Sequence, residues 1–335
     1  MLERRRNFMV STAPAEIRLD DDILFSDFML KWLEVTKSTV QITTYASYQG
    51  MVERVIVPYF RKRNIKLVDL KATDLQDFYN KQLERVKANS VIHYHANIHK
   101  SLKYAVKIDL IPTNPADKVE RPKKNEFKGS YYSADEIHAL TEVAEGTKLE
   151  IPVLLASFYG LRRSEVLGLK WDSINFAMQT LTIRHTVARV TKVVEKNKTK
   201  NASSFRSFPL TDDAVRLFKI LLQQEQYYRN HFGKDYIDND YVFTWEDGHP
   251  YSPDYVSHTF HKLLKKYDLP HIRFHDLRHT CASMLLSEGY GLKDVQEWLG
   301  HSDIKMTANI YGHLDIRRKR SIANGLEQAL PRLKP

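Results

Sequence analysis

The chain has 335 residues, 42% of them hydrophobic, and a formal net charge of +10. This length is sufficient for two domains with separate cores. The single cysteine, Cys281, excludes intramolecular disulfides and predicts a reducing, cytoplasmic environment. The charge favours a polyanionic partner, and it equally fits a merely basic protein.

Membrane association is not predicted. The longest apolar run, 151–161, is about half the length of a membrane span and ends at Arg162-Arg163. The basic N-terminus is soon interrupted by Glu16 and Arg18, so it lacks the apolar core of a signal peptide.

Residues 1–18 are polar and irregular, and predict a flexible lead-in. From 19 to 118 the apolar residues recur at spacings of three and four, which predicts a bundle of short helices. Helix starts are predicted at Asp27, at Thr43-Thr44, at Thr73 with its capping-box pattern, and at Ser90. Helix ends are predicted at Pro58 and at Asn114-Pro115. Residues 119–130 show no apolar periodicity and predict a linker. Its Lys123-Lys124 pair fits a solvated tether or a contact to a phosphate backbone.

Residues 131–320 form a second predicted domain, in which helices flank a small sheet. Ser133 caps a first helix, a buried helix follows, and further helices start at Thr211 and at Ser252-Pro253. Alternating β-branched and aromatic residues predict antiparallel strands at 180–184, 186–194 and 204–209, with 241–244 as a further short strand. Residues 321–335 predict a C-terminal tail helix. The expected fold is mainly α with a small antiparallel β-sheet.

The stretch from His275 to Tyr311 holds the strongest chemical signal. His275 and Arg278 are three apart, so on a helix they share a face and can contact one anion, such as a phosphate. His301 adds a third basic group, and Tyr311 is a candidate nucleophile. Cleaving a phosphodiester without a metal also needs cations on the non-bridging oxygens and an acid for the leaving oxygen. Arg162 and a lysine of the lysine-rich β-turn are candidates for these tasks.

Each of these residues alone has a plain structural explanation. An arginine after a buried helix is usually a solvated terminus, a lysine-rich turn is usually just exposed, and a helical tyrosine often packs. His271, His275 and His279 are spaced like zinc ligands. The helix begins only near His275, however, because Pro270 precedes it, so His271 is out of register. We therefore expect no metal site and no cofactor.

Four motifs follow one another along the chain: GLRRSEVLGLKW at 160–171, KTKNASSFRSFPL at 198–210, HDLRHT at 275–280 and LGHSDIKMTANIY at 299–311. With the helical stretches TYASYQGMVERVIVPYF and YAVKIDLIPTNPADKVE, they extend over most of the chain. In residue types, order and spacing the chain resembles the tyrosine recombinase (phage integrase) family. The resemblance implies a core-binding helical domain, 19–118, followed by an α+β catalytic domain, 131–320.

The resemblance implies an enzyme that cleaves and rejoins DNA strands through a 3′-phosphotyrosyl intermediate, integrating or excising a phage or mobile element. Tyr311 matches the nucleophile of the family. Arg162 and Arg278 match the two arginines that hold the scissile phosphate, and His301 matches a residue that hydrogen-bonds it. His275 matches the histidine that assists proton transfer.

Two further assignments rest on the resemblance. Glu165 matches an acidic residue that buttresses the site. The general acid is implied to be a lysine on the hairpin, commonly just before a threonine. Lys198 fits that pattern and is preferred, Lys200 fits the count back from Pro209, and Lys196 is the weakest candidate.

The implied partners are double-stranded DNA with attachment-type sites, further copies of the chain in a tetramer, and an excision or DNA-bending accessory protein. Apolar residues of the tail, such as Ile322 and Leu326, fit packing on their own domain, and the resemblance favours docking on a neighbouring protomer. Many integrases carry an additional arm-binding domain, whereas about 20 residues precede the first helix here, too few to fold alone. The chain is then either of a simpler subgroup or a shortened form.

The nearest alternative function is DNA relaxation by a type IB topoisomerase-like enzyme, which shares the chemistry but acts as a monomer. The spacing from LGHS to Tyr311 and the small N-terminal bundle favour the recombinase.

Overall fold

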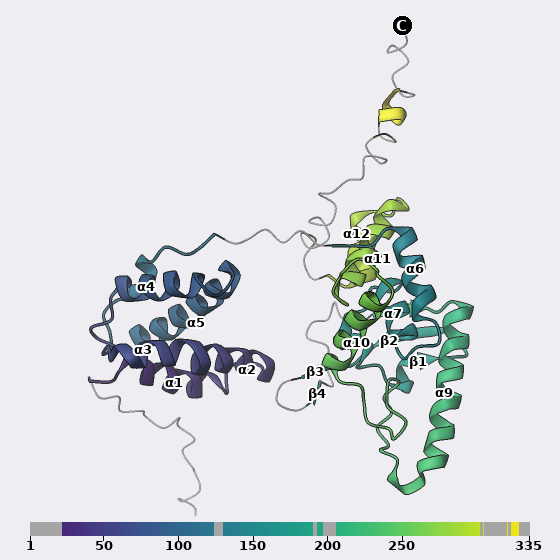
Figure 1. The fold of residues 1–335 in the computed structure, drawn as a ribbon, viewed down its shortest axis with the longest axis horizontal. Helices are drawn as coiled ribbons and strands as arrows, with labels where there is room; N and C mark the ends of the chain where they lie inside the picture. The colour runs from purple at the N-terminus through teal and green to yellow at the C-terminus, as the bar shows by residue number, and fades with distance from the viewer. Residues whose placement is uncertain are drawn as a thin grey trace, which may run out of the picture. The chain divides into compact units, whose positions relative to one another are not determined.

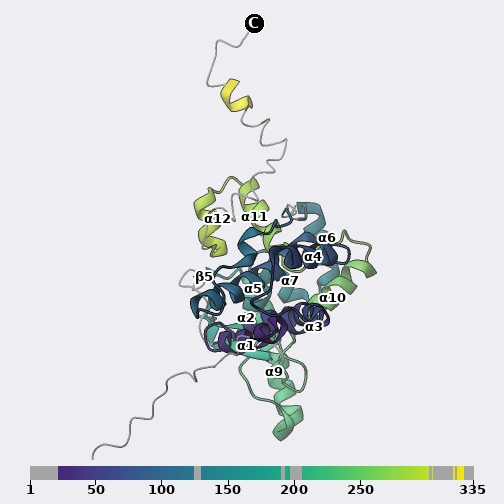
Figure 2. The ribbon, with the colours of Figure 1, turned by 90° about the vertical axis from the view of Figure 1, so that its left-hand side faces the viewer.

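The computed structural model describes residues 22–123, 130–189, 193–196, 206–301, 304, 320 and 323–327. The chain divides into two compact units, Met1–Phe127 and Lys128–Pro335 (Figure 1, Figure 2). Three predicted site residues, Lys198, Lys200 and Tyr311, lie outside the described residues. Of the predicted tail helix, residues 323–327 are described; they are helical, and Leu326 among them is exposed.

The first unit is a helical bundle, as predicted. It contains α1 (Phe25–Thr36), α2 (Ile42–Met51), the π-helical turn η1 (Val52–Ile56), α3 (Val57–Arg63), α4 (Ala72–Leu83), α5 (Ala88–Lys107) and the 3₁₀ turn η2 (Pro115–Lys118). Its core is rich in aromatic side chains, with the rings of Phe25 and Phe60 edge to face at 4.8 Å. The Tyr79 hydroxyl lies 3.0 Å from Nδ1 of His95, so these two buried polar groups satisfy each other.

Pro58 does not stop a helix, so that prediction is wrong. α2, η1 and α3 follow one another directly, and Pro58 lies in the first turn of α3. A proline inside an α-helix lacks an N–H and crowds the carbonyl four residues earlier. Here that carbonyl belongs to Arg54, which lies in the wider π-helical turn, out of α-helical register. The helix ends instead at Asn64, in the left-handed conformation with φ 52°.

Two other helices of this unit begin before their predicted caps. The Asp74 carboxylate caps α4 by accepting from the N–H of Lys71 at 3.0 Å, so Thr73 is not the cap. α5 begins at Ala88, before Ser90. A competing local group, Asp74, explains the earlier start of α4, whereas α5 begins without a side-chain cap. Both differences change where a helix starts without changing that it forms.

The second unit surrounds a buried helix, α7. Its helices are α6 (Ala134–Ala144), α7 (Glu150–Ser157), α8 (Arg163–Val166), η3 (Trp171–Ser173), α9 (Asp212–Phe232), η5 (Gly233–Asp235), α10 (Pro253–Lys266), α11 (Asp276–Ser287) and α12 (Leu292–Leu299). The predicted caps Ser133, Thr211 and Ser252 are confirmed, because each side chain accepts from a backbone N–H in the first turn. α7 packs against α6, α8 and α11, and so brings the starts of α8 and α11 together.

The strands form two small antiparallel sheets where one was predicted. β1 (Ile174–Asn175), β2 (Thr180–Ile183) and β5 (Arg206–Pro209) form a three-stranded sheet in the order β1-β2-β5. The prediction of one strand at 186–194 is wrong. Two strands, β3 (Thr186–Arg189) and β4 (Val193–Lys196), pair antiparallel with each other and form a separate two-stranded sheet. Residues 241–244 make isolated bridges, Lys170 with Tyr241 and Thr244 with Pro250, in place of the predicted strand.

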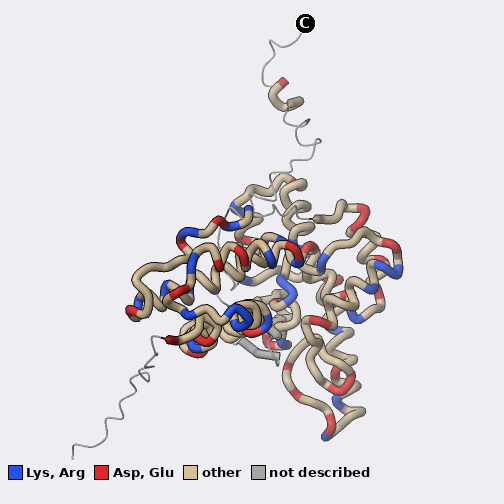
Figure 3. The backbone as a smooth tube through the Cα atoms, turned by 60° about the vertical axis from the view of Figure 1, so that its left-hand side comes forward, with Lys and Arg blue, Asp and Glu red and all other residues tan. Residues whose placement is uncertain are grey.

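None of the described helices combines the length and apolar character that crossing a bilayer requires. Figure 3 marks Lys and Arg along the helices of both units, interspersed with Asp and Glu. The excess positive charge is therefore spread along the chain, and an anion site has to be located from individual contacts.

Candidate active site

Arg278 is a buried charge at the centre of the second unit. It lies on α11 with 2% of its surface exposed. Its Nη1 donates to the carbonyl of Gly160 at 2.6 Å, and its Nη2 donates to the carbonyl of Leu299 at 2.5 Å. These bonds fix the plane of the guanidinium, and with it the direction of its other N–H groups. Burial and the charge of Arg162 lower the pKa of Arg278 to about 9, so it stays protonated at neutral pH.

Arg162 reaches the same place from the start of α8. Its Nη2 donates to the carbonyl of Gly300 at 3.1 Å. The two arginines therefore bind consecutive carbonyls, of Leu299 and Gly300, directly before the buried His301. Three side chains predicted to contact a phosphate are thus brought together from segments far apart in the sequence.

Gly160 allows this close approach. Its φ is +64°, and a Cβ built there would clash with Leu299 and lie 3.3 Å from Sγ of Cys281. Its carbonyl is also the one that holds Arg278. An alanine would add backbone strain and push apart the segments that orient the guanidinium.

Gly160→Ala is expected to lower the free energy of unfolding by about 3 kcal/mol and to impair DNA cleavage. Gly146→Ala is the matched control, because Gly146 has φ +69° but no atom within 4 Å of a built Cβ. It should cost only the left-handed strain of about 1 kcal/mol. Urea unfolding of both variants checks this. Equal losses in the two variants would show that the packing at Gly160 is unimportant.

Glu165 links the arginines below the site. Its carboxylate is 1% exposed and accepts from Nη1 of Arg162 at 2.5 Å and from Nη2 of Arg206 at 2.9 Å. Burial alone would raise the pKa of Glu165, but Arg206, Arg162 and Arg278 outweigh burial and lower it to about 2. One carboxylate thus lies among three guanidinium groups, which leaves an excess of positive charge for an anion to neutralise.

Arg206 is a site residue that the sequence analysis missed. It lies on β5, its side chain is 8% exposed, and its guanidinium carbon is 5.2 Å from the centre of the Phe208 ring. The alternation in β5 places Arg206 and Phe208 on one face of the strand. An arginine on the same face as a buried phenylalanine was the available signal, but its carboxylate partner is 41 residues away in the sequence.

Glu165→Gln is expected to remove a pH-dependent part of the stability. The pKa of Glu165 is about 2 in the folded protein, compared with 4.5 for the same group without these neighbours, as in the unfolded chain. The ion pairs therefore stabilise the fold fully above pH 4.5 and less as the pH falls toward 2. The difference in unfolding free energy between wild type and variant should be about 3 kcal/mol at pH 7 and shrink below pH 4.5. Denaturant unfolding across this range checks it, with exposed Glu145→Gln as the control. A difference independent of pH would contradict it.

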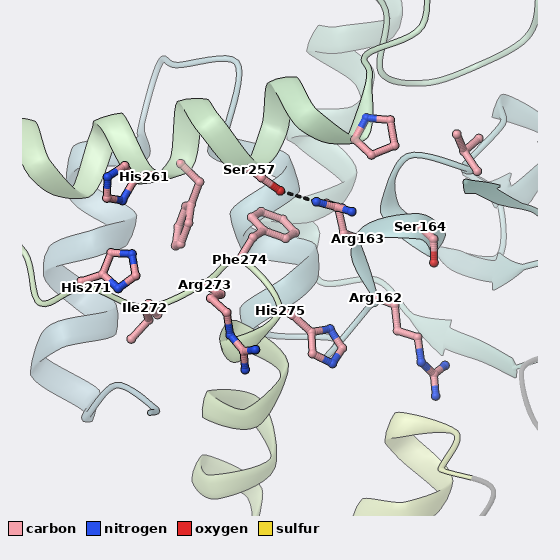
Figure 4. Close-up of a pocket in the computed structure, with 13 residues that line it drawn as sticks. Arg162, Arg163, Ser164, Ser257, His261, His271, Ile272, Arg273, Phe274 and His275 are labelled. Carbon is pink, nitrogen blue, oxygen red and sulfur yellow. Dashed lines mark hydrogen bonds between the residues drawn. The ribbon is translucent and has the colours of Figure 1, made fainter. Parts of the chain in front are cut away.

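His275 and His301 are neutral in the free protein. Burial is the largest cause that lowers the pKa of His275 to about 4, and nearby His279, Arg278 and Arg162 lower it as well. Burial is also the largest cause that lowers the pKa of His301 to about 3, with further contributions from the charges of Arg278 and Arg162. A neutral imidazole carries one N–H and one unprotonated ring nitrogen, so it is chemically able to donate to a phosphate or to accept a proton. Figure 4 shows the His275 ring and the Arg162 guanidinium extending to the same side of the second unit.

Family comparisons cover both units. Residues 131–318 match the Phage integrase family, and residues 24–83 match the phage integrase N-terminal SAM-like domain. The chain is 31% identical over 327 residues to the tyrosine recombinase XerC-like protein of Caldanaerobacter subterraneus subsp. tengcongensis, covering 91% of this chain and 83% of the relative. It is 25% identical over 295 residues to the ICEBs1 integrase of Bacillus subtilis, covering 85% and 78%.

Solved structures share the fold. The Tn1549 transposon integrase, in complex with a circular intermediate DNA, aligns with a TM-score of 0.74 over 91% of this chain and 99% of that chain, at 17% identity. Lambda integrase, as a tetramer bound to a Holliday junction, aligns with a TM-score of 0.66 over 87% and 78%, at 18% identity. The predicted fold class is confirmed. From the family match and the XerC-like relative, the chain belongs to the phage integrase family of tyrosine recombinases, enzymes that cleave and rejoin DNA strands.

Proposed function

We propose that this recombinase integrates or excises a phage or mobile element, and that Arg162, Arg278 and His301 bind the scissile phosphate of duplex DNA. The observation that carries the proposal is the meeting of the two guanidinium groups on the Leu299 and Gly300 carbonyls, beside His301. Planar cations fixed in this way suit the paired non-bridging oxygens of a phosphodiester. Their attraction grows as charge develops on those oxygens in the transition state.

Tyr311 is the proposed nucleophile. Its oxygen forms a bond to phosphorus as the bond from phosphorus to the 5′ oxygen breaks, which leaves a 3′-phosphotyrosyl link and a free 5′-hydroxyl. His275, neutral in the free protein, assists by accepting the tyrosine proton. Lys198, with Lys200 as the alternative, donates the proton to the leaving 5′ oxygen. Attack by a 5′-hydroxyl from another strand reverses the steps and rejoins the DNA without an external energy source.

Glu165 and Arg206 are proposed to hold this arrangement in place. The Glu165 carboxylate accepts from the backbone N–H of Arg162 at 2.9 Å and from its side chain, so it fixes the arginine at both ends. Arg206 keeps Glu165 ionised and ties β5 to the site. Arg206 is the first residue of β5, so this ion pair fixes the start of that strand.

The proposed assembly is a tetramer on attachment-type DNA sites, with exchange through a Holliday junction. Lambda integrase has been solved as a tetramer bound to a Holliday junction, and as a dimer bound to a core site. Relatives of this chain include a prophage integrase of Lactococcus lactis and a Tn916 transposase of Enterococcus faecalis, which supports a mobile element as the DNA substrate. An accessory protein that bends the DNA or directs excision is a further proposed partner.

The test is a nicked duplex that carries the attachment site found in the DNA flanking the gene. Cleavage next to the nick releases a short fragment, so the covalent adduct accumulates. We expect an adduct that forms equally well in excess EDTA, since the arginines supply the positive charge. Mass spectrometry of the adduct should place the DNA on the peptide that contains Tyr311. No adduct, or one that EDTA prevents, would overturn the proposal.

A second assay separates recombination from DNA relaxation. A supercoiled plasmid with two attachment sites should yield recombinant products at a rate that rises steeply with protein concentration. A monomeric topoisomerase-like enzyme would relax plasmids with or without the sites and form no recombinants.

A further inference from the structure

Tyr132 contacts the chain on both sides of His275 and Arg278. Its hydroxyl donates to the carbonyl of Pro270 at 2.5 Å, and its backbone N–H donates to Oγ1 of Thr280 at 3.0 Å. The partners lie 138 and 148 residues further along the sequence, so both bonds are long-range. These two bonds, here called the Tyr132 bridge, hold both ends of the stretch that contains the two site residues.

Tyr132 is itself fixed in the core of the second unit. It is 2% exposed, and it belongs to the same cluster of buried hydrophobic side chains as Ile272 and Phe274. Burial raises the pKa of Tyr132 to about 12, so its hydroxyl stays protonated and donates to the carbonyl. Side chains in a close-packed core have little freedom to move, so the Tyr132 bridge starts from a fixed point.

Short-range bonds connect the ends of this stretch to His275. Oγ1 of Thr280 also donates to the carbonyl of Asp276 at 3.2 Å, and the Asp276 carboxylate accepts from the backbone N–H of Arg273 at 2.8 Å. His275 therefore lies between two residues that are bonded to each other, and it directly follows the buried Phe274. Figure 4 shows this stretch passing beside α10 before it enters α11. The backbone on both sides thus sets the position of His275.

Arg278 depends less on the Tyr132 bridge. The carbonyls of Gly160 and Leu299, which come from two other segments, hold its guanidinium. His275 lies at the start of α11, and its side chain does not cap that helix. The Tyr132 bridge should therefore matter most for the placement of His275.

We propose that Tyr132 is a positioning residue, which keeps the His275 imidazole in the place from which it accepts the proton of the nucleophile. This inference rests on the proposed function, because it takes His275 to act in proton transfer. A base must lie within hydrogen-bond reach of the proton, and a displacement of about 1 Å can slow a reaction about 100-fold. Loss of the Tyr132 bridge should therefore slow cleavage. DNA binding should not weaken, because the Tyr132 side chain is buried.

Two other roles for Tyr132 fit less well. A second nucleophile or a general acid would need a hydroxyl that can reach the DNA, whereas this hydroxyl is bonded to Pro270 in the interior of the unit. A residue that only fills space in the core would need the ring alone, and phenylalanine would serve equally. Tyr132→Phe therefore separates positioning from packing.

The first experiment measures single-turnover adduct formation by the full chain on the nicked duplex at saturating DNA. Tyr132→Phe should slow it about 10- to 100-fold and leave the dissociation constant unchanged. Thermal stability should change little, because Pro270 is exposed and water can replace the lost bond. Tyr79→Phe is the matched control, since it removes a buried hydroxyl that contacts His95 in the first unit, and it should form the adduct at the wild-type rate.

Thr280 tests the other half of the Tyr132 bridge. Thr280→Val keeps the shape of the side chain and removes the oxygen that accepts from Tyr132, so it should also slow adduct formation at saturating DNA. Thr280→Ser keeps that oxygen and should restore most of the rate. Equal rates in the valine and serine variants would contradict a role for this bond.

A His275→Gln background decides whether Tyr132 acts through His275. His275→Gln alone should slow adduct formation about 100-fold. Adding Tyr132→Phe should then change the rate by less than about twofold, because the group that Tyr132 positions is already absent. A loss of structure alone would slow both backgrounds by the same factor. Equal slowing in both backgrounds, a fast His275→Gln variant, or Tyr132→Phe at the wild-type rate would overturn the inference.

Hydrogen exchange of the free protein tests the Tyr132 bridge without cleavage. Peptides from 270–280 should exchange faster in Tyr132→Phe than in wild type or Tyr79→Phe, while other peptides of the second unit should exchange as in wild type. Unchanged exchange in 270–280 would overturn the inference, whatever the cleavage result. A wild-type protein that forms no adduct would instead overturn the proposed function, so the two failures are distinguishable.

Discussion

Tyr311→Phe is expected to form no covalent adduct with DNA while binding it as tightly as wild type. The substitution keeps the aromatic ring and removes the hydroxyl oxygen, which is the proposed nucleophile. Adduct on the nicked duplex should fall at least about 1000-fold, because no other group is proposed to attack the phosphorus. Denaturing gels measure the adduct, and anisotropy measures the noncovalent dissociation constant on the same DNA.

Tyr290→Phe is the matched control for this loss. Tyr290 lies between α11 and α12 and is 54% exposed, so its hydroxyl is accessible but has no proposed role. That variant should form the adduct at the wild-type rate. An adduct that persists in Tyr311→Phe would mean that another residue attacks, and peptide mapping of that adduct would identify it.

The features that could be predicted from the sequence are those that local chemistry decides. Ser133, Thr211 and Ser252 each cap a helix through a bond to a backbone N–H a few residues away, and the predictions at all three are confirmed. The prediction that a helix stops at Pro58 also failed for a local reason. The π-helical turn before α3 cannot be recognised from the pattern of apolar residues.

The errors in the sheets have a non-local cause. The residues of β3 and β4 alternate as one long strand would, and only their antiparallel pairing with each other shows that they are two strands. Arg206 was missed for the same reason: its importance comes from Glu165, which lies on a different element. Motif order placed Arg162, Arg278 and His301 in one site, but it carried no information about the carbonyls of Leu299 and Gly300 that orient them.

Arg278→Lys is expected to slow adduct formation at saturating DNA by about 100- to 1000-fold. Lysine keeps the charge but presents its N–H groups from one point, so it cannot hold the Gly160 and Leu299 carbonyls and still present a planar pair of donors to the phosphate. Because Arg278 is 2% exposed, the carbonyl left without a partner should also lower the unfolding free energy by about 2 kcal/mol.

Arg162→Lys separates the catalytic effect from the structural one. The Arg162 side chain is 30% exposed, so water can replace its lost hydrogen bonds and the stability cost should be smaller than for Arg278. Its rate of adduct formation should nevertheless fall about as far, since both guanidinium groups are proposed to bind the same phosphate.

Exposed Arg216→Lys, which changes an arginine paired with Asp213 at 3.0 Å, should affect neither the rate nor the stability. Single-turnover rates measured on the folded protein decide the question. If Arg278→Lys loses stability but cleaves within about tenfold of wild type, Arg278 holds the fold together and another group binds the phosphate.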